Sequence, residues 1–323
     1  MRKLCNNSGK RKQIFSKQEK TVFMGDQEVS TQANESKLRE FTKAVINDLQ
    51  AIEKMFEDNL FEDGPFRIGA EQEMFLVDSA MLPAPIAMEV LEDARDERLT
   101  TEIGLFDLEA NLTPHDFSGK CLSLIENEID ELLAKVKAST KKLDSDVALV
   151  GILPTIEQSD LVIENLTPLP RYQELNRILT ELQGDDRVIH IKGLDELTLH
   201  LQDIFTEFCN TSFQVHLQVP ISEFVNYYNW SQAITAPVLA SAVNSPLFLG
   251  HRLWSETRLA LFQHATDTRS PVHQARSQPT RVNFGDEWVN DSMLSVFRED
   301  LARFRIILTR EIEENSLETL KNG

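Results

Sequence analysis

Two glutamates two positions apart, Glu71 and Glu73, interrupt the otherwise apolar stretch GAEQEMFLVD at residues 69–78. In an extended strand, residues two apart project from the same face and lie about 7 Å from each other. Like charges that close repel unless a cation lies between them or water surrounds them. The pair therefore predicts either a strand that binds a cation or a strand whose polar face is in water.

Two later stretches show the same alternation of polar and apolar side chains. In FDLEANLTP, Asp107 and Glu109 share a face, and in TSFQVHLQVP, His216 shares a face with two glutamines. Strand faces in water usually mix basic residues with acids. The polar segments 69–73, 105–111 and 212–218 contain no Lys or Arg.

If these strands are neighbours, carboxylates, amides and one imidazole meet on one face. Oxygen ligands suit Mg²⁺, and a histidine among them also admits Mn²⁺. The pattern therefore favours a divalent-metal site. A sheet with its outer face in water remains the alternative, and a single strand histidine is more often structural.

Candidate cationic side chains come later, between residues 256 and 285. That stretch contains four arginines and few acids, and guanidinium groups suit phosphate or carboxylate oxygens. The arginines are Arg258, Arg269, Arg276 and Arg281. A solvated loop would also carry such charges. The sequence has no Walker-type glycine loop, no dinucleotide fingerprint and no GxSxG motif, so those ways of binding nucleotide or activating a serine are excluded.

The surrounding elements follow from hydrophobic periodicity and from breaker residues. Helices are expected over 36–58, 86–95, 119–143, 222–240, 252–265 and 287–313, with loop plus a helix over 155–187. Strands are expected from residue 67, over 100–114, at VALVGILP and at TSFQVHLQVP. The strands alternate rather than being apolar throughout, which predicts an α+β fold with a mainly antiparallel sheet and helices on one face.

Charge and composition restrict the partners. The 323 residues carry a net charge of −19, although residues 1–20 contain seven Lys or Arg and one Glu. An acidic surface repels nucleic acid and anionic membranes, so neither is an expected partner. Three cysteines without metal-like spacing indicate reduced thiols and a cytoplasmic protein. Residues 1–35 lack apolar periodicity, which predicts a disordered basic tail.

Six ordered blocks carry a family resemblance: GAEQEMFLVD, FDLEANLTP, GLDEL, CNTSFQVHLQV, NSPLFLG and SETRLALF. Between about residues 66 and 313 the chain resembles the glutamate–cysteine ligase type 2 family of carboxylate–amine ligases. The resemblance implies a glutamine synthetase-like fold with a curved antiparallel sheet. It implies ATP and Mg²⁺ as cofactors, with the metal held by Glu71, Glu73, Glu109 and His216. It also implies that Arg258 lies near the nucleotide or the acyl phosphate.

The implied activity is ATP-dependent joining of glutamate to an amine such as cysteine, as in glutathione biosynthesis. Similar proteins continue past this C-terminus, so residues 36–323 are expected to form a catalytic domain that is incomplete at its C-terminal end. Two other functions stay open, namely a non-catalytic nucleotide- or metal-binding protein of this fold and a phosphotransferase of guanidino kinase type. A homo-oligomer also stays open.

Overall fold

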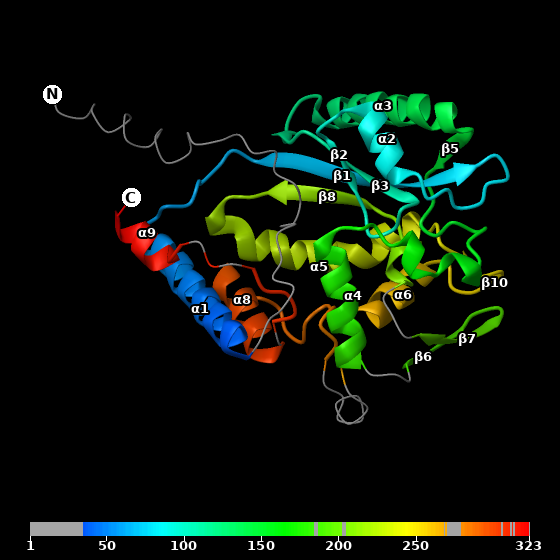
Figure 1. The fold of residues 1–323 in the computed structure, drawn as a ribbon. Coiled ribbons are helices and arrows are strands. Elements are labelled where there is room, and N and C mark those ends of the chain that lie inside the picture. Colours follow the sequence, from blue (N-terminus) through cyan, green and yellow to red (C-terminus); the bar gives the residue numbers. More distant parts are fainter. Residues whose placement is uncertain are drawn as a thin grey trace.

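The computed structural model describes residues 35–183, 187–201, 205–267, 269, 279–304, 306–310, 312 and 314–322 (Figure 1). The described helices are α1 (Glu35–Glu57), α2 (Ala87–Ala94), α3 (Cys121–Thr140), α4 (Pro170–Gln183), α5 (Phe224–Ser241), α6 (Thr257–Ala265), α8 (Met293–Arg303) and α9 (Ser316–Asn322). The described strands are β1 (Arg67–Asp78), β2 (Leu99–Thr101), β3 (Asp107–Asn111), β4 (His115–Asp116), β5 (Ser145–Ala148), β6 (Arg187–Lys192), β7 (Glu196–Leu201), β8 (Phe213–Gln218), β9 (Leu247–Phe248) and β10 (His251–Arg252). Apart from Glu35, the predicted tail 1–35 lies outside the described residues.

The main sheet is built around β1, the longest of the described strands. Along one edge β1 pairs with β3 and β4, and along the other edge it pairs with β8 and β5. β2 continues the sheet beyond β3, while β6–β7 and β9–β10 form separate two-stranded ladders. All the pairings between these strands are antiparallel, which confirms the predicted α+β class.

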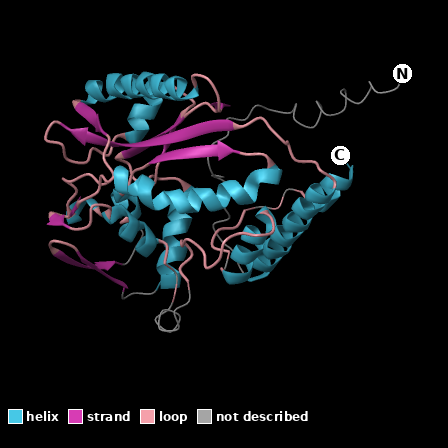
Figure 2. Cartoon of the chain, turned by 180° about the vertical axis from the view of Figure 1, so that it is seen from behind, coloured by secondary structure: helices cyan, strands magenta, loops and turns pink. Residues whose placement is uncertain are grey.

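Two hydrophobic cores lie against the main sheet. The first packs Ile68, Met74 and Leu76 of β1 against α2 and α3, which cover the upper side of the sheet in Figures 1 and 2. The second includes Phe75 and Val77, at one end of the opposite face, together with side chains of β6, β7 and α6. The expectation of helices on one face therefore holds only in part, since α6 contributes to this second core.

The acidic part of β1 borders the second core. Gly69, Glu71 and Glu73 alternate with the first-core residues and so share a face with Phe75 and Val77. Apolar packing therefore closes one end of the polar face, while its other end approaches the surface near Arg67, which is partly exposed.

Besides the strand expected at VALVGILP, which is only Ser145–Ala148, and the helix expected over 252–265, which begins at Thr257, three other elements differ from the sequence prediction. The single strand expected over 100–114 is two strands, β2 and β3, joined through a turn at Gly104. A Cβ atom at Gly104 would lie 2.7 Å from Asp107 Oδ2, so the turn depends on glycine. The hairpin β6–β7 was not predicted, although its alternating apolar residues Ile189, Ile191, Leu197 and Leu199 are buried.

The third difference is the helix expected over 287–313, because α8 spans only Met293–Arg303. Before α8, the amide of Asn229 donates to Val289 O at 2.7 Å, and Val289 N donates to Asn229 Oδ1 at 3.0 Å. These bonds use backbone groups that a helix would need for itself. After α8, Phe304 has an extended backbone.

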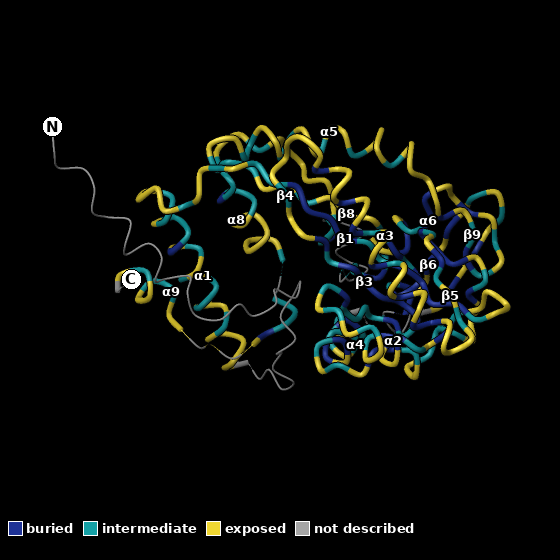
Figure 3. The backbone as a smooth tube through the Cα atoms, turned by 90° about the horizontal axis from the view of Figure 1, so that it is seen from above, coloured by how far each residue is buried: buried dark blue, intermediate teal, exposed yellow. Residues whose placement is uncertain are grey.

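Several helices outside the main sheet are largely exposed to solvent. Helices α1, α8 and α9 group together away from α2 and α3 (Figures 1 and 3). Helix α5 contains no charged residue and no buried one, and its Trp230 is 68% exposed. None of the described helices is both long enough and apolar enough to cross a bilayer.

Candidate active site

The register of the main sheet brings the three polar strand faces together. Glu73 lies opposite Glu109 of β3, and Glu71 lies between Asn111 of β3 and Gln214 of β8. Residues directly opposite each other in an antiparallel pair project from the same face. The three strands, which the sequence analysis had to assume to be neighbours, are therefore neighbours in the sheet.

A carboxylate that the sequence reading did not single out joins this face. Glu102 follows β2, and one ligand oxygen from each of Glu73, Glu102 and Glu109 lies within 4.8 Å of the others. Asn111 Nδ2 donates to Glu109 Oε1 at 2.6 Å and orients it. We refer to Glu71, Glu73, Glu102 and Glu109 as the acidic cluster.

Strand β8 and the residue before it fix the position of Glu73. Ser212 N donates to Glu73 Oε2 at 2.6 Å and Ser212 Oγ donates to the same oxygen at 3.2 Å. Gln214 Nε2 donates to the other oxygen, Oε1, at 3.3 Å. These bonds hold the carboxylate toward the face that it shares with Glu109.

The pKa values of these acids reflect burial and mutual repulsion. Burial, with a smaller contribution from Glu109, raises the pKa of Glu73 to about 7 even though Ser212 opposes the shift. Burial and the neighbouring Glu73 and Glu109 raise the pKa of Glu102 well above its ordinary value. Burial and Glu109 also raise the pKa of Glu71, while His216 lowers it. Without a bound cation, Glu73 and Glu102 therefore keep their protons to higher pH than ordinary carboxylic acids do.

Among the described residues, three buried carboxylate oxygens at or near this site lack a hydrogen-bond partner, namely Glu71 Oε1, Asp107 Oδ1 and Glu207 Oε2. Glu71 and Asp107 are only 3% and 1% exposed. His216 Nε2 lies 3.5 Å from Glu71 Oε1, which is too long for a good hydrogen bond. Buried acceptors without a donor are costly, and a divalent cation would satisfy them. The donor set of carboxylates and one imidazole fits Mg²⁺ or Mn²⁺.

Arg258, at the start of α6, is linked to the acidic cluster indirectly, through the backbone of Thr211 and Ser212. Its Nε donates to Glu256 Oε2 at 2.6 Å, and its Nη1 donates to Thr211 O at 2.9 Å. Thr211 immediately precedes Ser212, which holds Glu73. A Cβ atom at Gly151 would lie 3.3 Å from Arg258 Cδ, so the guanidinium stem passes close to the chain there.

The other predicted arginines have different surroundings. Arg269 Nη2 forms an ion pair with Asp267 Oδ2 at 2.7 Å. The Arg281 guanidinium lies 5.2 Å from the centre of the Phe304 ring. Arg276 lies outside the described residues. None of the contacts described for Arg269 and Arg281 links them to the acidic cluster, and their role in nucleotide binding stays a prediction.

The sequence reading missed three residues at or near this face. Glu102 lies in the turn between β2 and β3, where the sequence predicts a single strand. Glu207 is close to Glu73, and burial, with a contribution from Glu73, raises its pKa to about 8. Arg67 lies four residues before Glu71 on the same face of β1, a period-two signal that was present in the sequence.

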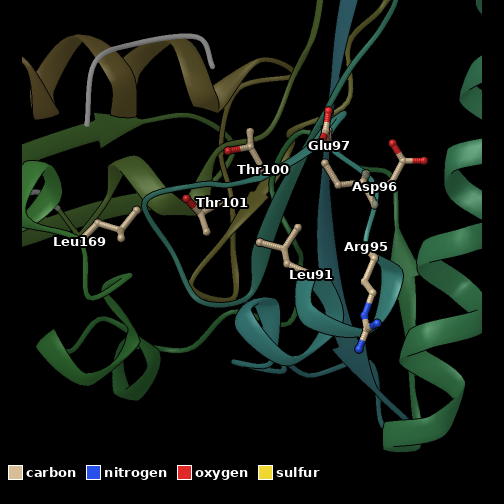
Figure 4. A pocket seen from close by; sticks show the side chains of 8 residues that line it. Leu91, Arg95, Asp96, Glu97, Thr100, Thr101 and Leu169 are labelled. Atoms are coloured by element: carbon tan, nitrogen blue, oxygen red, sulfur yellow. The ribbon is translucent and has the colours of Figure 1, made fainter. Parts of the chain in front are cut away.

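A cavity of about 420 Å³ lies away from the acidic cluster, at the outer edge of β2 (Figure 4). Its lining includes the apolar side chains of Leu91, Leu99 and Leu169. Of the two acids in its lining, Asp96 accepts hydrogen bonds from Arg98 at 2.7 and 2.9 Å, and Glu97 shares the lining with Arg95. The buried acids with raised pKa values lie on the polar face of β1 rather than in this cavity.

A comparison with protein-family models matches residues 67–314 to glutamate-cysteine ligase family 2. This chain belongs to that family. The matched residues run from the first residue of β1 past the end of α8, so they contain the acidic cluster, His216 and Arg258. The resemblance in the six sequence blocks is thereby confirmed, and the chain falls within the carboxylate–amine ligase superfamily. A search of curated proteins finds no match.

Proposed function

We propose that this chain is an ATP-dependent carboxylate–amine ligase of the glutamate–cysteine ligase type, built on a glutamine synthetase-like sheet. One observation carries the proposal. In a member of this family, the register of β1 with β3 and β8 gathers acids whose repulsion calls for a cation. Such a face suits a reaction in which an anionic acid meets an anionic triphosphate.

The metal-binding residues are proposed to be Glu71, Glu73, Glu109 and His216, with Glu102 as a further carboxylate. Bound Mg²⁺ would supply positive charge that neutralises the phosphates of ATP. Ser212, Gln214 and Asn111 keep the carboxylates oriented through the hydrogen bonds already described. Such outer partners are needed because metal ligands lose affinity when they can rotate.

The reaction needs no covalent enzyme nucleophile. The substrate carboxylate attacks the γ-phosphorus of ATP, which releases ADP and forms an acyl phosphate. The amine then attacks the acyl carbon, phosphate leaves, and the nitrogen loses a proton. Cys209 is unsuited to act as such a nucleophile. It is fully buried, and burial raises the pKa of its thiol well above the ordinary value.

Arg258 is proposed to stabilise the transferring phosphoryl group or to hold the segment that orients Glu73. Its bonds to Glu256 and Thr211 fix its stem beside Ser212. A guanidinium group presents several donors in a rigid plane, which suits phosphate oxygens. Lysine at this position would supply only a point charge.

The test is ADP and phosphate release, by the 323-residue chain and by a form extended at its C-terminus, with Mg²⁺, ATP, glutamate and a panel of amines that includes cysteine. ADP formation that requires both the acid and the amine, together with an amide product found by mass spectrometry, is expected. ATP binding without turnover would instead favour a non-catalytic binding protein. A phosphorylated product without a new carbon–nitrogen bond would favour a phosphotransferase. The Glu73→Gln variant is the inactive control.

A further inference from the structure

Strand β8 forms a free edge of the main sheet. Among the described strands it pairs only with β1 (Figure 1). Glu73 N donates to Ser212 O at 3.0 Å, so in this antiparallel ladder Ser212 and every second residue after it turn their backbone groups toward β1. The residues between them, Phe213, Val215 and Leu217, turn theirs outward. No backbone hydrogen bond to another described residue uses these outward groups.

The side chains of the same three residues are also exposed. Phe213, Val215 and Leu217 are 47%, 55% and 42% exposed. Natural edge strands usually carry a charged residue, a proline or a bulge that prevents pairing with another chain. The sequence of β8, FQVHLQ, contains no Lys, Arg, Asp, Glu or Pro. This edge is therefore open to pairing with a further strand.

The residue pattern of β8 is complementary to itself. If two copies of β8 pair antiparallel about a twofold axis at Val215, Phe213 lies opposite Leu217 of the second copy, and Gln214 lies opposite His216. Apolar side chains then meet apolar ones, and polar side chains meet polar ones. The outward residues form three hydrogen-bonded pairs with two bonds each. Moving the axis to Gln214 or His216 leaves only two of these pairs, so Val215 is the centre that uses the edge most fully.

Charge and area also indicate how a second copy would bind. The chain has a net charge of −19, so two copies repel each other over much of their surface, but β8 and α5 contain no charged residue. The three apolar side chains of β8 supply about a third of the roughly 800 Å² that each partner buries in a standard interface. Helix α5 offers further apolar side chains, including Trp230 and Ile234, which are 68% and 48% exposed. A weak, concentration-dependent dimer is expected from a surface of this size.

We propose that β8 pairs antiparallel with β8 of a second copy of this chain, about a twofold axis at Val215, and so joins the two main sheets into one. The polar face then continues across the axis. Gln214 of the second copy lies opposite His216, at the border of the acidic cluster. Neither ATP nor a substrate takes part, so the dimer is independent of the proposed ligase function.

The test is sedimentation equilibrium of the 323-residue chain from about 1 to 200 µM, the concentrations at which weak interfaces form. A reversible monomer–dimer equilibrium is expected. Val215→Lys places two like charges directly opposite each other at the axis and should weaken the dimer about tenfold or more. Val188→Lys makes the same change at a valine of β6 that is 49% exposed. This matched control should leave the dimerisation constant within about twofold of the parent.

Two further changes test the backbone pairing and the register. Leu217→Pro removes an outward N–H that makes no bond to β1, so it should weaken the dimer while the sheet is kept. Phe213→Lys and Leu217→Glu should each weaken the dimer. The double variant that carries both changes places opposite charges across the axis in two symmetric pairs, so it should dimerise more tightly than either single variant. Circular dichroism and melting curves check that every variant is folded.

The outcomes decide the proposal directly. A parent chain that stays monomeric at every concentration would overturn it, and the edge would then be left to a strand of a different protein. Equal dimerisation of the parent, Val215→Lys and Leu217→Pro would overturn it as well. An equal loss in Val188→Lys would indicate unspecific association instead. A double variant that dimerises no better than its single variants would rule out the axis at Val215.

Discussion

Two groups of charged residues lie at the main sheet, and their acids behave in opposite ways. One is the acidic cluster on the polar face of β1. The other, which we call the arginine network, consists of Asp96, Arg98, Glu128, Glu131 and Lys135 and joins β2 to α3. Arg98 binds Asp96 at 2.7 Å, Glu128 at 2.9 Å and Glu131 at 2.7 Å, and Lys135 also binds Asp96.

The protonation of the two groups follows from these partners. Hydrogen bonds from Arg98 lower the pKa of Asp96 and of Glu131, whereas burial raises the pKa of Glu73 and of Glu102. The arginine network shows what this chain does when acids serve to connect elements, because each receives a cation. The acids of the acidic cluster instead accept hydrogen bonds from amides and a hydroxyl group. This arrangement is expected of side chains that bind a cation.

The largest expected effect concerns activity. Glu73→Gln and Glu109→Gln should each lower turnover more than about 100-fold, since removing even the outer partners of metal ligands costs 10- to 100-fold. Metal affinity by calorimetry should fall in parallel. Glu131→Gln, an exposed acid of the arginine network, is the control and should leave both quantities nearly unchanged. Unaltered Mg²⁺ and Mn²⁺ affinity in both cluster variants would refute the metal site.

The next effect concerns stability. Arg98→Met should lower the free energy of unfolding by about 3 kcal/mol, because it leaves Glu128 largely buried without its cation and leaves Asp96 with Lys135 alone. Glu128 on α3 also accepts hydrogen bonds from Thr113 N and Oγ1. The position of Thr113, just after β3, therefore depends on the same network. Urea unfolding measures the loss. A change below about 1 kcal/mol would place Arg98 among ordinary surface ion pairs.

A pH-dependent effect distinguishes the acidic cluster, with Glu207 beside it, from the arginine network in the metal-free chain. The folded pKa values of Glu73 and Glu207, about 7 and about 8, lie above the ordinary 4.5. Between pH 4.5 and these values the unfolded chain loses protons that the folded chain keeps, so stability should fall as pH rises. The slope is at most about 1.4 kcal/mol per pH unit for each group, and it should level off above about pH 8.

Unfolding in EDTA between pH 5 and 8 tests this slope. The lowered pKa of Asp96 acts only below about pH 4, outside the window, so the arginine network contributes nothing to it. Glu73→Gln should reduce the slope, and added Mn²⁺ or Mg²⁺ should flatten it. A flat profile in the metal-free parent would mean that the cluster is solvated and carries ordinary carboxylates.

The smallest effect concerns Arg258. In an active preparation, Arg258→Lys should lower turnover about tenfold and change the melting temperature little, because the stem packing is retained while the planar donor group is lost. Kinetics and thermal melting on the same sample give the two readouts. Early melting with normal turnover would assign Arg258 to the structural ion pair with Glu256.

The central residues of the site could be predicted from the sequence, because the alternation of polar and apolar side chains along a strand is a local pattern. Alternation alone places Glu71 with Glu73, and Asp107 with Glu109, on single faces of their strands. Which strands meet was an assumption until the register paired Glu73 with Glu109 and Gly69 with His216.

Other parts of the site depend on contacts between distant segments, which alternation cannot show. Glu102 reaches the cluster only because a glycine turn folds β2 back on β3. The end of α8 depends on Asn229, which binds the backbone at Val289. The arginines after residue 265 look alike in sequence, yet Arg269 pairs with Asp267 and Arg281 lies against Phe304.

The pairing of β1 also affects how the protein folds. Glu73 and Ser212, which hydrogen-bond to each other, are 139 residues apart in the chain. Contacts of such long sequence separation form slowly, because the loop between them must be closed first. During synthesis, residues 67–72 of β1 can pair along the edge that faces β8 only after β8 has been made. The acidic face is therefore completed late in folding, and metal binding would report on the finished sheet rather than on an early intermediate.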